Sequence, residues 1–360
     1  MNDRNFQYYH LNSILSGLSN NEVGKKIEGG QIGNGWGFNS IIQIDGKKIF
    51  VKKIPLTQKE YDNSYSTYNH YNLPLFYNYG VGSAGFGAFR ELLMHIKTTN
   101  WVLSGEHKNF PLMYHYRITP NRHQAKYSKP ENLPSYIEKW NNSKTLHNYL
   151  IERRNPSFEI ILFLEFIPFV LHQWLPENSD KIYNFSEKIF TTFNFLTKKK
   201  IIHFDAHWGN ILADGENPFL TDFGLALDLS FCMNENEKNF FTEHKYYDYF
   251  EYIGCISILL VNKYNMLSNE EKNDLKSKYG IHGDQSNTER IKLMIENIDL
   301  LEKDKLLNLE DNYIQFLKEH KNLIYESNSF FENLKSNPKK DTPYKKKIVK
   351  KILTNNNIIK

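Results

Sequence analysis

The chain has 360 residues, long enough for two domains or for one fold built from two unequal parts. Hydrophobic residues make up 40% and charged residues 24%, so we expect a globular protein, and a net charge of +4 is too small to indicate specific nucleic-acid binding. The two cysteines, Cys232 and Cys255, exclude a disulfide scaffold and a cysteine-rich zinc site. The polar start lacks a signal-peptide core, and no apolar run reaches the ~20 residues of a membrane span. We therefore expect a cytoplasmic protein, with export by a non-classical route still open.

The first half of the chain mixes helical and strand patterns. Residues 1–22 predict a helical lead-in, and residues 26–53 predict a strand, the glycine-rich turn "QIGNGWGFNS" and a β-hairpin. The hairpin turn is Asp45-Gly46, which is a strong turn signal between two β-rich runs. Residues 87–98 carry apolar side chains at helical spacing. Insertions are predicted near 57–83, which is irregular, and near 99–155, where a helix end, a strand and a further helix are expected.

The second half is mostly helical. Residues 158–167 predict a buried strand, and residues 179–200 predict a long amphipathic helix. A buried helix is expected at 246–264 and further amphipathic helices at 286–335. Residues 336–360 are rich in lysine and asparagine, and we expect a basic, poorly ordered tail with at most weak attraction to an anionic surface. The order of the elements predicts an α+β fold, with a small β-rich part that has one main helix and a larger helical part.

Three oxygen-bearing side chains cluster around the sequence "IIHFDAHWGNIL". Asp205 and Asn210 are five residues apart, and Asp222 follows twelve residues later in "TDFG". Carboxylate and amide oxygens are ligands that Mg²⁺ accepts, together with phosphates and water. Phosphoryl transfer needs two such metal-holding groups, a base and a lysine on the phosphates. A metal site built on His203 and His207 would need a helix here, which Gly209 and the flanking strands disfavour.

The segments "HFDAHWGNIL" and "FLTDFGLA" resemble the catalytic core of the protein-kinase superfamily, in which H-x-D-x-x-x-x-N precedes D-F-G. The resemblance covers roughly residues 25–265. It implies a bilobal fold that binds ATP and Mg²⁺. Residues 1–164 would form the N-lobe, including its lead-in helix and insertions, residues 165–168 the hinge and residues 169–335 the helical C-lobe.

The resemblance also implies roles for single residues. Asp205 would be the catalytic base, Asn210 and Asp222 would hold Mg²⁺, and His203 would support the loop. "IFVKK" stands at the third strand, so Lys52 would bind the α- and β-phosphates of ATP. The remaining residues expected to bind the nucleotide are Gly33, Gly35 and Gly37 by their backbone amides, Glu165 and Ile167 by their backbone, and Glu91, or alternatively Glu60, as the partner of Lys52.

The chain departs from protein kinases at several positions. The glycine turn is one residue shorter than G-x-G-x-x-G, and no A-P-E motif follows the D-F-G triplet. Phe204 stands where many protein kinases have Arg, so we predict activity that does not depend on phosphorylation of the following loop. His207 stands where protein-serine kinases have Lys and is expected to bind the γ-phosphate. The pattern D-x-H-x-x-N is commoner in aminoglycoside phosphotransferases and choline kinases.

The sequence therefore favours a bacterial, eukaryotic-like protein serine/threonine kinase whose partner is a protein substrate. The alternative is a kinase for a small hydroxylated molecule, such as an aminoglycoside, choline or a sugar. A third possibility is an ATP-binding pseudokinase scaffold, which the intact set of Lys52, Asp205, Asn210 and Asp222 disfavours.

Overall fold

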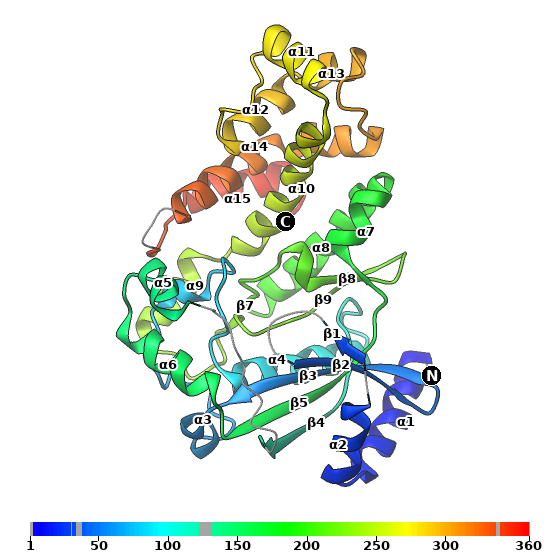
Figure 1. Ribbon diagram of the computed structural model, residues 1–360, viewed down its shortest axis with the longest axis vertical. Helices are drawn as coiled ribbons and strands as arrows, with labels where there is room; N and C mark the ends of the chain where they lie inside the picture. The colour runs from blue at the N-terminus through cyan, green and yellow to red at the C-terminus, as the bar shows by residue number, and fades with distance from the viewer. Residues whose placement is uncertain (1–2, 30, 34–37, 122–131, 336–338, 360) are drawn as a thin grey trace.

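A computed structural model describes residues 3–29, 31–33, 38–121, 132–335 and 339–359 of the chain. An antiparallel sheet and its helices form one end of the molecule, and a longer group of helices forms the other (Figure 1). The structure confirms the α+β class. No helix within the described ranges is both long enough and apolar enough to cross a bilayer.

The main sheet has five strands in the spatial order β1-β2-β3-β5-β4, with every neighbouring pair antiparallel. The turn between β2 and β3 is formed by Asp45 and Gly46, which have φ values of 47° and 71°, so the predicted hairpin is confirmed. The strands are β1 (Gln31–Gly33), β2 (Phe38–Ile44), β3 (Lys47–Leu56), β4 (Met113–Pro120) and β5 (Phe158–Glu165).

The two faces of β3 are covered by different helices. Ile54 and Leu56 belong to a buried cluster with Leu92 of α4 (Ala88–Leu103), which is the helix predicted at 87–98. Side chains alternate along a strand, so Lys52 points to the same face as Ile54 and toward α4. Val51 points to the opposite face and joins the larger core, which includes α1 (Asp3–Gly17) and α2 (Asn20–Glu28). The strand register thus aims Lys52 at α4.

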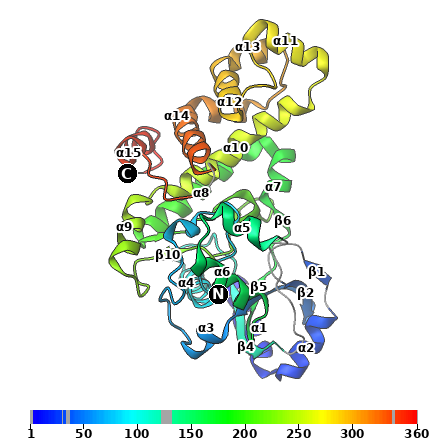
Figure 2. The same cartoon turned by 60° about the vertical axis from the view of Figure 1, so that its left-hand side comes forward.

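The two segments predicted to be insertions contain short helices, and one of them, α6 (Lys144–Arg154), lies beside β3 (Figures 1 and 2). Tyr77 and Tyr136 join the two insertions through a hydrogen bond of 2.8 Å between their hydroxyl groups. The Tyr136 hydroxyl also donates to the carbonyl of Gly82. These helices are α3 (Gln58–Asp62), η1 (Leu75–Asn78), α5 (Leu133–Lys139) and α6 (Lys144–Arg154).

The helical part begins after β5 and carries short strand pairs that hold the sequence around Asp205. The long helix predicted at 179–200 is confirmed as α8. Its helices are α7 (Leu171–Trp174), η2 (Leu175–Lys181), α8 (Ile182–Lys198), η3 (Trp208–Asn210), α9 (Glu235–Glu243), α10 (Tyr247–Met266), α11 (Asn269–Tyr279), α12 (Asn287–Glu296), α13 (Ile298–Lys303) and α14 (Asp311–Leu334). Its strands are β6 (Phe169–Val170), β7 (Ile201–Ile202), β8 (Ile211–Ala213), β9 (Pro218–Leu220) and β10 (Leu227–Asp228).

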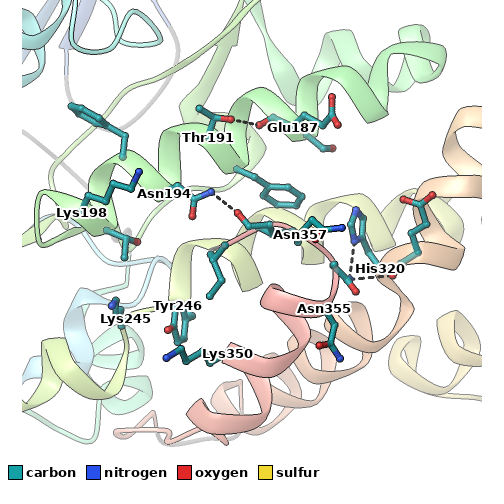
Figure 3. A pocket seen from close by; sticks show the side chains of 18 of the residues that line it. Glu187, Thr191, Asn194, Lys198, Lys245, Tyr246, His320, Lys350, Asn355 and Asn357 are labelled. Carbon is teal, nitrogen blue, oxygen red and sulfur yellow. Dashed lines mark hydrogen bonds between the residues drawn. The ribbon is translucent and has the colours of Figure 1, made fainter.

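The expectation of a poorly ordered tail is wrong for residues 339–359. Helix α15 (Lys346–Asn355) packs beside α14, and its residues Val349 and Leu353 are fully buried. These two residues are four positions apart and share one helix face, while the lysines occupy the solvent side. The chain end is also held by Asn194 of α8, whose side-chain amide donates to the carbonyl of Ile358 at 2.5 Å. Figure 3 shows this end of the chain between α8 and α14.

Candidate active site

Lys52 forms two ion pairs with carboxylates from distant parts of the chain. Its Nζ lies 2.7 Å from Glu91 Oε1 on α4 and 2.8 Å from Asp222 Oδ1 after β9. Burial lowers the pKa of Lys52, but the charges of Asp222 and Glu91 outweigh it, so the pKa of Lys52 is raised. Burial would raise the pKa of Asp222, yet the Lys52 charge brings that pKa down to about 2. Lys52 and Asp222 are therefore both ionised at neutral pH.

Of the two glutamates considered for Lys52, the structure places Glu91 at the lysine. Glu60 has another task, because one of its carboxylate oxygens accepts a hydrogen bond from the backbone amide of Thr57 at 3.0 Å and closes the capping box of α3. Its other oxygen accepts from the amide of Ala88 at 3.0 Å and caps the first turn of α4. Glu60 thus supports the helix that carries Glu91.

Asp205 is held by its neighbours in the loop between β7 and β8. The Asn210 side-chain amide donates to Asp205 Oδ2 at 2.7 Å and to the Asp205 carbonyl at 3.0 Å. His203 is fully buried, and its Nδ1 accepts from the Asp205 amide at 3.2 Å while its Nε2 lies 2.9 Å from the carbonyl of Thr221. Burial lowers the pKa of His203 to about 4, so this histidine is neutral. His203 therefore links the loop that carries Asp205 to the segment that carries Asp222.

Two residues of this site have backbone conformations that side chains other than glycine rarely adopt. Phe204 and Asp222 have φ values of 62° and 61°. Asp248 of α10 offsets the strain at Phe204, because its carboxylate accepts from the amides of His203 and Phe204 at 2.9 Å each. The Phe204 ring is fully buried and packs 5.0 Å from the Tyr247 ring. Strained residues that the surrounding structure holds in place are typical of functional sites.

The side of Asp205 away from Asn210 faces Gly80, a residue of the segment 57–83 that is predicted to be an insertion. A Cβ at Gly80 would stand 2.2 Å from Asp205 Oδ1, 2.6 Å from Glu251 Oε1 and 2.8 Å from the carbonyl of Phe204. Only glycine permits this approach. The Gly80 amide donates to the Tyr247 hydroxyl at 3.2 Å. The insertion therefore forms one wall beside the Asp205 carboxylate.

Carboxylates crowd this side of the site. Burial, followed by the charge of Asp222, raises the pKa of Asp205 to about 8. Burial, followed by the charges of Asp205 and Asp248, raises the pKa of Glu251 well above its usual range. Glu251 is 5% exposed, and its Oε2 has no hydrogen-bond partner among the described residues. This side of the site is thus suited to hold a proton.

His207 lies at the edge of the site, and its side chain is 40% exposed. Its Nδ1 accepts from the Gly209 amide at 2.9 Å and begins η3, while its Nε2 lies 3.6 Å from Asp205 Oδ1. Burial, more than any charge, lowers the pKa of His207 below its usual value. The neutral ring therefore caps the loop and faces Asp205.

Asn210 and Asp222 have a suitable arrangement for Mg²⁺. The Thr221 amide donates to the Asn210 carbonyl at 3.0 Å, so the two segments are bonded directly beside the two side chains. An ionised carboxylate and an amide oxygen from adjacent segments fit a hard cation that takes its other ligands from phosphates and water. Within the part of the chain that is described, no group of three or more His, Cys, Asp or Glu residues could hold a metal ion without such help.

The other expected nucleotide contacts are less complete. Gly33 ends β1 opposite Asn39, while Gly35 and Gly37 lie outside the described residues. The Glu165 amide donates to the carbonyl of Leu112 at 2.7 Å, so an adenine would have to use the Glu165 carbonyl and the backbone of Ile167. The Glu165 carboxylate forms an ion pair of 2.6 Å with Arg4 of α1.

The sequence interpretation missed the glycine-rich segment that precedes α4. Its pattern G-x-G-x-x-G spans residues 80–85, and Gly82 and Gly85 have φ values of 98° and 110°. The pattern suggests a phosphate-binding loop, but several of its amides already have protein partners. The Ala84 amide donates to a tyrosine hydroxyl, and the Phe86 amide donates to the carbonyl of Gly224 at 2.8 Å. The segment thus connects α4 to the strands and helices around Asp205.

A separate groove of about 1280 Å³ lies between α8, α14 and the end of the chain (Figure 3). Its lining carries both cations and anions, among them Lys198, Lys350 and Glu187. None of its lining residues belongs to the candidate active site.

Comparison with known proteins adds no assignment, because no protein-family model and no curated protein matches the chain. The roles of these residues must therefore be argued from their geometry.

Proposed function

We propose that this protein is an ATP-dependent phosphotransferase of the protein-kinase-like type, with a bilobal fold and a hydroxyl group as phosphate acceptor. The observation that carries the proposal is the pairing of Lys52 with both Glu91 and Asp222, next to the bonded pair Asp205–Asn210. These residues come from four segments of the chain, and together they supply the lysine, the metal-holding oxygens and the base that phosphoryl transfer needs.

Each residue has a separate task in this mechanism. Lys52 binds the α- and β-phosphates, and Glu91 keeps its ammonium group in place. Asn210 and Asp222 hold Mg²⁺, which neutralises negative charge on the phosphates when it is bound. Asp205 orients the acceptor hydroxyl and takes its proton, and its raised pKa suits it to that task. His203 and Asp248 keep the loop in the conformation that presents Asp205.

The class of acceptor has two candidates. The D-F-G triplet favours a protein serine or threonine, as predicted above, whereas the catalytic-loop pattern D-x-H-x-x-N is commoner in kinases of small molecules. A specific observation favours a small hydroxylated molecule instead, because Gly80 lies against Asp205 and the Gly80 amide is tied to Tyr247. A wall at this distance leaves less room for an extended peptide beside the carboxylate.

The test is phosphate transfer from γ-labelled ATP with Mg²⁺, measured in parallel on a mixed peptide panel and on a panel of aminoglycosides, choline and sugars. We expect transfer that the substitution Asp205→Asn removes. Labelled peptides would support the protein-kinase assignment, and labelled small molecules would support the second candidate. Transfer that survives unchanged in Asp205→Asn would contradict the proposed function.

A further inference from the structure

Helix α4 carries Glu91, and it is fastened to the helical part of the molecule next to that residue. Arg90 and Glu237 of α9 form an ion pair of 2.6 Å, and their side chains are 2% and 0% exposed. The Arg90 Nε also donates to the carbonyl of Thr67 at 2.8 Å. Glu237 is fixed in turn, because its other carboxylate oxygen accepts from the amide of Asn234 and closes the capping box of α9.

The same helix and the two residues before it make three further contacts. Lys97 Nζ lies 2.5 Å from Asp228 Oδ2 on β10, and the Asp228 side chain is 2% exposed. The His95 ring packs edge-on at 5.1 Å against the ring of Phe223, which follows Asp222. At the start of the helix, the Phe86 amide is bonded to Gly224. Contacts to the second half of the chain therefore occur at the beginning, in the middle and toward the end of α4.

The chemistry of the Arg90–Glu237 pair makes α4 hard to displace. A buried charge that loses its partner is strongly unfavourable, so α4 cannot move away from α9 without exposing or stranding both charges. The Arg90 guanidinium also lies 5.0 Å from the Phe86 ring and 5.4 Å from the Phe231 ring, which surround it with aromatic groups. Because Glu91 is the next residue, its place at Lys52 depends on the same turn of helix.

We propose that the ion pairs Arg90–Glu237 and Lys97–Asp228 form an α4 clamp that holds Glu91 at Lys52 without an activating modification. This inference rests on the proposed function for its catalytic meaning, since Lys52 is taken as the phosphate-binding lysine. The clamp carboxylates belong to the polypeptide itself, so no phosphate has to be added to hold the helix. Arg90, Glu237, Lys97 and Asp228 are positioning residues that act on Lys52 through Glu91.

The test compares hydrogen exchange of the α4 amides in Glu237→Gln and in a matched control, Glu235→Gln. The control removes an ion pair of α9, the helix that also carries Glu237. Both side chains of this pair are exposed, Lys238 by 49% and Glu235 by 80%. We expect Glu237→Gln to accelerate α4 exchange by at least about tenfold while the amides of α8 keep their wild-type rates. The control is expected to leave both helices unchanged.

Equal exchange rates of the α4 amides in Glu237→Gln and in the wild type would overturn the clamp. Acceleration of α4 and α8 by the same factor would also overturn it, because the ion pair would then stabilise the whole fold. If Glu237→Gln does not fold, Lys97→Met takes its place with the same expectation and the same contradicting results.

Steady-state kinetics supply a second readout. We expect Glu237→Gln to raise the KM for Mg·ATP and to lower kcat for the folded fraction, whereas a merely structural role would lower only the amount of folded protein. Failure of the proposed function would appear as no transfer by the wild type, and it would leave the exchange result intact.

Discussion

The two aspartates of the candidate site, Asp222 beside Lys52 and Asp205 beside Gly80, have pKa values that are shifted in opposite directions. On the lysine side, Glu91 and Asp222 are both within 2.8 Å of the Lys52 ammonium group. On the acceptor side, Asp205 and Glu251 both lie against Gly80. Within the described residues, the one basic side chain paired with either of them is His207, whose Nε2 lies 3.6 Å from Asp205 Oδ1. Lys52 and Asp222 thus keep their charges, although burial raises the pKa of Glu91, while the acceptor side favours a bound proton.

This difference matches a division of labour in phosphoryl transfer. Charged groups are needed where phosphates and Mg²⁺ bind, and a proton acceptor is needed where a hydroxyl loses its proton. The two sides should therefore respond differently to substitution. Changes on the lysine side should affect nucleotide binding, and changes on the acceptor side should affect turnover alone.

The largest effect is expected for Asp222→Asn. The substitution removes a carboxylate that pairs with Lys52 and is placed to hold Mg²⁺. We expect no measurable transfer and at least about tenfold weaker Mg·ATP binding in calorimetry. Asp284→Asn is the control, because the Asp284 side chain is 91% exposed. Wild-type Mg·ATP affinity in Asp222→Asn would remove this residue from the metal site.

Asp205→Asn should separate the two sides most clearly. Asparagine is nearly isosteric with aspartate but cannot take a proton from the acceptor. We expect turnover to fall by roughly 10²-fold or more, with Mg·ATP affinity within a few-fold of the wild type. If turnover on the true acceptor stayed at the wild-type level, Asp205 would have a structural role only, and the proposed function would be wrong.

Gly80→Ala tests the wall on the acceptor side. The added Cβ would meet Asp205 Oδ1 at 2.2 Å, so either the wall or the carboxylate must move. We expect turnover to fall by at least about tenfold, the scale of a small misplacement of a reacting group, while Mg·ATP binding is retained.

Gly82→Ala is a matched control for this substitution. Gly82 has a φ of 98°, but no atom lies within 4 Å of its missing Cβ. The control therefore carries the backbone strain of alanine at positive φ without the contact to Asp205. Equal turnover losses in both variants would show that an added methyl group elsewhere in this segment lowers turnover as much, and would leave the wall without a role in the acceptor site.

The lysine, the metal-holding residues and the base were easier to predict from sequence than the wall beside Asp205. Asp205, Asn210 and Asp222 lie within one short stretch, and the order of strands indicated Lys52. The contact of Gly80 with Asp205 depends on the path of an insertion, which no local pattern determines. Its only local signal was the spacing of four glycines at positions 80, 82, 85 and 87.

The fold shows the same limit. The hairpin at Asp45-Gly46 and the helix α8 follow from local turn chemistry and periodicity, and both predictions are confirmed. Helix α15 was missed because lysines dominate its composition, whereas its place depends on two buried residues, Val349 and Leu353. Removal of α15 would therefore uncover apolar surface of α14 as well as take away the lysines.

The smallest effect is expected for His207, which lies between the two sides. Its lowered pKa places its change of charge below the usual value of about 6.5. A group with a lowered pKa is neutral above its usual pKa and gains its charge only as the pH falls further. A charge gained there would lie 3.6 Å from Asp205 and near the expected γ-phosphate.

We expect His207→Lys to keep turnover within about tenfold of the wild type and to flatten its pH dependence below about pH 6.5. The control is His207→Gln, which stays neutral, so any pH dependence that it shares with the wild type belongs to Asp205 and not to His207. Turnover measured from pH 5 to pH 8 decides the matter, and identical profiles for all three proteins would remove His207 from the phosphate site.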